Sequence, residues 1–115
     1  MNMECINQVS ISGNVTRDPE LRTGNVLKFS VAVNDRRKVD GEWKEVPNFI
    51  DCVMFGARAE ALSNMVHKGT RVSIVGKLRY SSWEKDGQKR SKVEVAVDQL
   101  DFLSKGQEES DDFGW

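Results

Sequence analysis

Cysteine and histidine are scarce in this 115-residue sequence, which has Cys5, Cys52 and His67 as its complete set. A zinc site takes about four ligands, with pairs at short characteristic spacings, and no pair here has such a spacing. We therefore expect no metal site and no metalloenzyme chemistry.

Catalytic signatures are missing as well. The sequence has no Gly-rich phosphate loop, no paired carboxylates on one predicted strand, and no Ser or Cys with a plausible His partner. His67 fits a partly exposed position at a helix end beside Lys68, where a cation suits the helix dipole. The sequence predicts a protein that is not an enzyme and needs no cofactor.

Long apolar runs are also absent. The longest last only a few residues, whereas a helix needs about 20 to cross a bilayer. The first residues lack a basic stretch followed by an apolar one, so nothing there marks the chain for secretion. We expect a cytoplasmic protein with no membrane partner, whose two cysteines need not pair in a reducing compartment.

Charge is nearly balanced overall, with a net charge of −1 at pH 7, but it is unevenly distributed. Residues 105–115 carry one base and four acids, whereas residues 68–92 carry eight bases and two acids. A basic body with an acidic tail is typical of nucleic-acid binding even when the total charge is close to zero.

Alternation of apolar and polar residues predicts five strands. The first four cover residues 9–15, 27–34, 47–55 and 70–83, and the fifth follows the Asp86-Gly87 turn and bends near residues 98–99. Residues 17–20 predict a turn, and residues 34–46, centred on Asp40-Gly41, predict a polar hairpin loop. Apolar residues at helical spacing within residues 57–68 predict one helix, with Gly69 at its left-handed cap.

Three strands, one helix and two further strands favour an all-β fold, namely a five-stranded Greek-key barrel of the OB type. The helix between the third and fourth strands would close one end of the barrel. A four-stranded α+β sheet is the alternative. We assign residues 1–104 to the barrel domain and residues 105–115 to a short acidic tail, which we expect to be disordered because it lacks an apolar period.

Three aromatic residues lie where rings could stack on nucleic-acid bases. Phe49 and Phe55 share one face of the third strand, and Trp83 lies near the tip of the polar 79–90 hairpin. Single strands are bound by such rings together with Lys and Arg that follow the phosphates. The pattern also allows Phe49 and Phe55 to be core residues, and Trp83 to fold back onto its own barrel.

Basic residues accompany these rings in both predicted hairpins. Trp43 lies in the other charged loop, where a DNA contact and packing on a neighbouring hairpin are equally compatible with the pattern. The candidates for neutralising phosphates are Lys28, Arg36, Arg37, Lys77, Arg79, Lys89, Arg90 and Lys92.

An ordered set of short segments resembles the bacterial single-stranded DNA-binding protein family and covers about residues 6–103. The segments are NQVSISGNV at 7–15, TRDPELR at 16–22, FSVAVN at 29–34, FIDCVMFG at 49–56, AE at 59–60, KG at 68–69, VGKL at 75–78 and DGQKR at 86–90. Single pieces such as KG are common, whereas the whole set in this order and spacing is highly specific.

The resemblance implies an OB fold, a homotetramer, and sequence-tolerant binding of single-stranded DNA in replication, recombination and repair. Phe49, Phe55 and Trp83 fall on the family's base-stacking positions. A fourth position often holds Trp in the family; this chain has Arg37 there and Trp43 several residues later. Phe49 also replaces a frequent Trp, which implies weaker stacking at that position.

The C-terminal tail departs from the family pattern. Members usually run a long Gly-, Pro- or Gln-rich linker into an acidic tip that ends in Phe, and here the linker is nearly absent. The tip has two acids followed by two aromatics with a glycine between them, and its residues are Asp111, Asp112, Phe113, Gly114 and Trp115. We expect it to bind replication, recombination and repair proteins, its charges guiding and its rings anchoring.

The sequence therefore predicts a protein that coats and protects exposed single-stranded DNA in the cytoplasm, in association with the nucleoid. Two alternatives stay open. One is a primosome-type OB-fold dimer that bridges replication proteins, and the other is an OB-fold subunit that binds RNA or protein within a larger assembly. The acidic tail speaks against the first, because a bridging module has no evident need of one.

Overall fold

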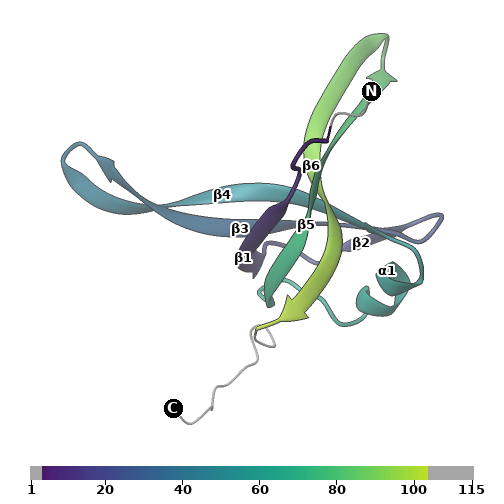
Figure 1. The fold of residues 1–115 in the computed structure, drawn as a ribbon, viewed down its shortest axis with the longest axis horizontal. Coiled ribbons are helices and arrows are strands. Elements are labelled where there is room, and N and C mark those ends of the chain that lie inside the picture. The colour runs from purple at the N-terminus through teal and green to yellow at the C-terminus, as the bar shows by residue number, and fades with distance from the viewer. Residues whose placement is uncertain (1–3, 104–115) are drawn as a thin grey trace.

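The computed structural model describes residues 4–103 and contains six strands and one short helix (Figure 1). In chain order they are β1 (Val9–Val15), β2 (Glu20–Arg22), β3 (Val26–Val39), β4 (Glu42–Phe55), α1 (Ala57–Leu62), β5 (Arg71–Lys85) and β6 (Gln88–Phe102). The partner-binding tip predicted at residues 111–115 lies outside the described residues.

Five of the strands form a closed barrel. The order is β1-β5-β6-β4-β3, and β1 closes the barrel by pairing with β3 as well as with β5. The β4–β6 pair is parallel, and the other pairs are antiparallel. This is the predicted OB barrel, and the α+β alternative is wrong.

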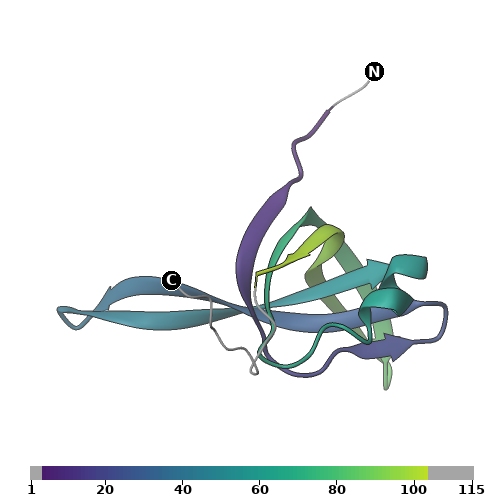
Figure 2. The same cartoon turned by 90° about the horizontal axis from the view of Figure 1, so that it is seen from below.

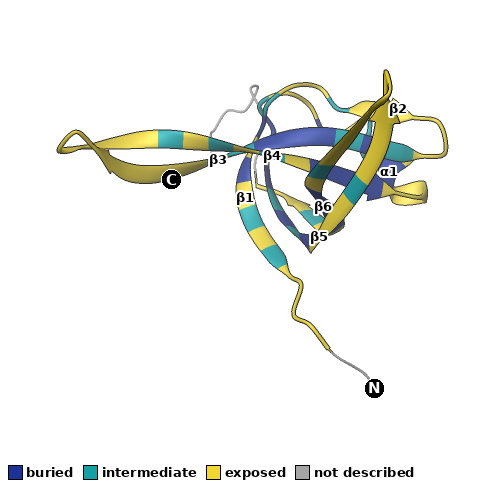
Figure 3. Ribbon diagram, turned by 90° about the horizontal axis from the view of Figure 1, so that it is seen from above, coloured by how far each residue is buried: buried dark blue, intermediate teal, exposed yellow. Residues whose placement is uncertain are grey.

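The barrel interior holds the apolar faces of the strands, as alternation predicted (Figure 3). The largest fully buried side chains of this core come from several strands and from the segment after α1: Leu27, Met54, Ile74, Val15, Val31, Val66, Val72 and Val95. Helix α1 lies at one end of the barrel, away from the β3–β4 hairpin, and buries Ala59 there (Figure 2).

The helix is shorter than the sequence predicted. It ends at Leu62, and turns continue the chain to residue 69. The Ser63 hydroxyl donates a hydrogen bond of 2.7 Å to the carbonyl of Glu60, the kind of local bond by which Ser competes with helix propagation. Val66 is nevertheless fully buried. Gly69 has the predicted left-handed conformation, with a φ of 89°, but the prediction that it caps the helix is wrong, because the C-cap is Ser63.

The hairpin predicted at residues 34–46 is confirmed with its centre at Asp40-Gly41, but its extent as a loop is wrong, because β3 and β4 stay paired out to Val39 and Glu42. Only Asp40 and Gly41 turn the chain, and both have positive φ, as a tight hairpin turn requires. Residues 34–45 are exposed throughout, so no apolar alternation marks this arm in the sequence. The short strand β2 was missed for the same reason, since its three residues are all exposed.

Two glycines allow strands to approach closely where the barrel bends. A Cβ atom on Gly13 would lie 2.2 Å from the carbonyl oxygen of Ala32, and one on Gly76 would lie 2.2 Å from that of Ala96. At Gly76 the β5–β6 register shifts, so that Val75 pairs with Gln99 while Gly76 pairs with Val97. Asp98 is therefore the extra residue of a bulge, at the bend predicted for residues 98–99.

Candidate nucleic-acid interface

Two exposed rings lie on the outer face of β4. Phe49 is 66% exposed and Phe55 is 42% exposed, while Cys52 and Met54 point into the core. Alternation along the strand places Asp51 and Val53 on the same outer face as the rings. The core interpretation of Phe49 and Phe55 is therefore wrong, and the rings are available to a ligand.

Neighbouring strands add cations to this face. Partners across a β ladder point to the same side of the sheet. Lys28 is opposite Val53, Lys77 is opposite Ala96, and Arg79 is opposite Glu94. Because Val53 also pairs with Ala96 across β4 and β6, one outer surface of the barrel carries these residues together. We call it the ring face and define it by Lys28, Phe49, Asp51, Val53, Phe55, Lys77, Arg79, Lys92 and Glu94.

The β5–β6 arm carries the third predicted stacking residue. Trp83 is 42% exposed, lies opposite Arg90, and follows Arg79 by an even number of residues along β5. Trp83 and Arg90 thus continue the alternation of the ring face. Lys89 is opposite Glu84 and lies on the other side of the arm.

The β3–β4 arm presents Trp43, which is 61% exposed. Its ring centroid lies 5.8 Å from the guanidinium carbon of Arg36 and 6.0 Å from the Nζ of Lys38. These contacts hold two cations beside an exposed indole. Arg37 is opposite Lys44 and alternates to the other side of this arm.

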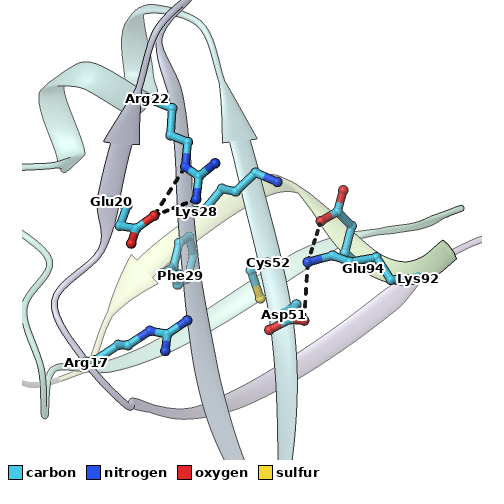
Figure 4. A pocket seen from close by; sticks show the side chains of 9 residues that line it. All are labelled: Arg17, Glu20, Arg22, Lys28, Phe29, Asp51, Cys52, Lys92 and Glu94. Carbon is cyan, nitrogen blue, oxygen red and sulfur yellow. Dashed lines mark hydrogen bonds and ion pairs between the residues drawn. The ribbon is translucent and has the colours of Figure 1, made fainter. Parts of the chain in front are cut away.

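A hollow of mixed charge lies between the ring face and β2 (Figure 4). Its lining residues are Arg17, Glu20, Arg22, Lys28, Phe29, Asp51, Cys52, Lys92 and Glu94. Arg22 donates a hydrogen bond of 2.8 Å to Glu20, and this bond with its charge lowers the pKa of the Glu20 carboxyl. Burial raises the pKa of the Cys52 thiol to about 12, and the nearby carboxylates of Asp51 and Glu94 add to the increase.

Two of the predicted phosphate contacts, Arg79 and Lys92, form ion pairs with acidic residues, and the sequence did not predict these pairs. Glu94 Oε2 lies 3.6 Å from Arg79, and Glu94 Oε1 lies 3.6 Å from Lys92, which also lies 3.4 Å from Asp51. Arg79 in turn lies over the Phe55 ring, 4.7 Å from its centroid. In the sequence, Glu94 is one polar residue in an alternating strand, and nothing there marks it as buried.

Within residues 4–103, no cluster of His, Cys, Asp or Glu is arranged to hold a metal ion. In the same range, no helix has the length and apolar character needed to cross a membrane.

Comparison with known proteins gives one consistent family. The model of the single-strand binding protein family matches residues 6–103. A single-stranded DNA-binding protein of Borreliella burgdorferi is 44% identical over 110 residues, which cover 90% of this chain and 74% of that protein. Another, from Treponema pallidum, is 42% identical over 105 residues, which cover 88% of this chain and 60% of that protein.

Solved structures agree with the barrel. The Plasmodium falciparum SSB in complex with ssDNA matches with a TM-score of 0.79 at 24% identity, covering 90% of this chain and 100% of that chain. A deletion mutant of the single-stranded DNA-binding protein from Thermus aquaticus matches with a TM-score of 0.74 at 33% identity, covering 86% of this chain and 51% of that chain. The first likeness, at its low identity, bears on the OB fold alone.

Proposed function

Because this chain belongs to the single-strand binding protein family, we propose that it binds single-stranded DNA along the ring face, as a non-enzymatic protein. The observation that carries the proposal is the exposure of Phe49 and Phe55 on the ring face, and of Trp83 on the arm that continues this face, all among cations. Rings buried in the core could not have met a base.

In this proposal, the rings bind the bases by stacking, and the cations bind the phosphates. Every base has a flat face, so stacking on Phe49, Phe55 and Trp83 tolerates any sequence. Cations on the ring side that form no ion pair within residues 4–103 are the first candidates for phosphates, namely Lys28, Arg36, Lys77 and Arg90. Duplex DNA hides its base faces in the stack, so it should bind this surface less well.

We also propose that the protein acts in replication, recombination and repair, in the cytoplasm at the nucleoid. In this proposal, residues 111–115 recruit partner proteins through acids and terminal aromatics. The active form is a homotetramer. Support for assembly comes from exposed apolar side chains on the other side of the β5–β6 arm, namely Leu78, Tyr80 and Val93.

The experiment is a titration of the full chain with oligo-dT, followed by tryptophan fluorescence. Stacking on Trp83 should quench the emission, and a duplex of equal length should compete poorly. The Trp83→Ala variant should lose much of the quenching. The loss of quenching in Trp43→Ala measures how far DNA contacts the β3–β4 arm. Equal affinity for duplex and single strand would overturn the stacking mechanism and leave a general polyanion binder.

A further inference from the structure

The centre of the ring face holds a buried carboxylate between two cations. The side chain of Glu94 is 2% exposed, yet it lies on the outer side of the sheet, where alternation places Lys92 and Arg79 as well. Its two oxygens divide between these partners, Oε2 toward Arg79 and Oε1 toward Lys92, each at 3.6 Å. A carboxylate so deeply buried requires such partners, because an unpaired buried charge is strongly destabilising.

Arg79 and Lys92 each make a second contact, with a side chain of β4. The guanidinium carbon of Arg79 lies 4.7 Å from the centroid of the Phe55 ring. Lys92 lies 3.4 Å from Asp51 (Figure 4). Glu94 thus links β5, β6 and β4 through two side chains that the sequence predicts as phosphate contacts. One face of the Phe55 ring is covered by Arg79, and the ring remains partly exposed for a base.

The charges of this cluster cancel. Arg79 and Lys92 supply two positive charges, and Asp51 and Glu94 supply two negative ones. A phosphate that approached either cation would have to compete with a carboxylate already in place. Two further cations of the ring face, Lys28 and Lys77, form no ion pair within residues 4–103 and lie opposite Val53 and Ala96, beside the cluster.

We propose that Glu94 is a positioning residue that sets strand selectivity, an inference that rests on the proposed function. With Asp51, it withholds Arg79 and Lys92 from phosphates and keeps Arg79 against Phe55. The middle of the ring face therefore carries no net charge and favours base stacking. The bases of a single strand can stack on it, whereas those of a duplex are paired and stacked on one another. Phosphate attraction is left to the surrounding cations.

The test is the salt dependence of binding for Glu94→Gln, which keeps the shape of the side chain and removes its charge. Freed cations should contact phosphates, so the plot of log K against log salt should steepen by about 0.7 for each cation released. Affinity for duplex at low salt should rise by a larger factor than affinity for oligo-dT. Asp51→Asn removes an exposed carboxylate that pairs only with Lys92, and Lys92 keeps its pair with Glu94. The slope should therefore change by less than one contact, and by less than in Glu94→Gln.

The matched control is Glu84→Gln, which removes the same charge from an exposed position on the same arm and breaks no ion pair within residues 4–103. In a Lys92→Gln background, Asp51→Asn should have no further effect on the slope. If Glu94→Gln and Asp51→Asn both match the control in slope and in duplex affinity, the carboxylates are structural and the inference is overturned. Failure of the wild-type chain to bind oligo-dT would instead overturn the proposed function itself.

Discussion

Cys52 shows how depth changes the chemistry of a single residue. Burial raises the pKa of its thiol from an ordinary value of 9.0 to about 12. The unfolded chain therefore ionises first as the pH rises, so the stability contributed by the neutral thiol is present below pH 9 and is lost toward pH 12. Urea denaturation at pH 7 and pH 10 should show a larger loss of unfolding free energy in wild type than in Cys52→Ala. Equal losses in the two proteins would contradict this account.

Phe49 offers a direct test of stacking at the residue scale. It is largely exposed, so truncating it should barely change the melting temperature. A stacked base is worth about 1–3 kcal/mol by alanine substitution, so Phe49→Ala should weaken oligo-dT binding by that amount. Phe49→Trp presents a larger ring and should bind more tightly than wild type. The prediction fails if both variants bind oligo-dT as wild type does, or if Phe49→Ala melts much earlier.

At the scale of elements, the barrel depends on the close approach of β5 and β6 at Gly76. A Cβ on residue 76 would lie 2.2 Å from the backbone carbonyl oxygen of Ala96, so β5 and β6 would have to move apart to admit a side chain. We expect Gly76→Ala to lower the unfolding free energy by more than the control Gly41→Ala. Gly41 has open space around it, and its positive φ should limit the cost to about 1–2 kcal/mol. Thermal melts of the two variants give the order, and a reversed order would contradict the role of the contact.

The sequence predicted those elements that have one face in the core. In β1 and in the barrel half of β3, apolar and polar residues alternate in the sequence, because these segments place one face of the strand in the core. The outer halves of both hairpins have water on both faces, so no period marks them. Their length follows from strand register, and register is fixed by contacts distant in sequence.

The site was predictable in part for a related reason. Rings set among cations in a polar stretch, such as Trp83, are visible in the sequence itself. The pairing of Arg79 with Glu94 and of Lys92 with Asp51 joins separate strands, and alternation alone could not bring them together. Two of the predicted phosphate contacts, Arg79 and Lys92, are therefore ion-paired in the structure, which the sequence did not show.

For the whole molecule, the acidic tail should compete weakly with DNA for the basic surface. The full chain has a net charge of −1, although residues 1–104 carry 16 bases and 14 acids. Deleting residues 106–115 should leave affinity for oligo-dT equal or slightly higher at low salt, and the gain should vanish as salt screens the charges. Filter binding at several salt concentrations measures this, and weaker binding by the truncated chain would contradict it.

The oligomeric state of the chain can be measured directly. If the chain forms a homotetramer, its mass in solution is roughly four times 13.0 kDa, with and without residues 106–115. Light scattering coupled to size exclusion measures it. A dimer would favour the primosome-type alternative, and loss of assembly on truncation would place the tail in the interface.

The two hairpin arms extend in different directions from the barrel (Figure 1), and this shape has a consequence for backbone amide exchange. Residues 34–45 and 82–91 are exposed and lie in two-stranded ladders, which are marginally stable without a core beneath them. Their amides should exchange with deuterium well before those of the barrel, whose opening requires global unfolding. A bound strand lying along the arms would slow that exchange, so deuterium uptake would record the path of the DNA amide by amide.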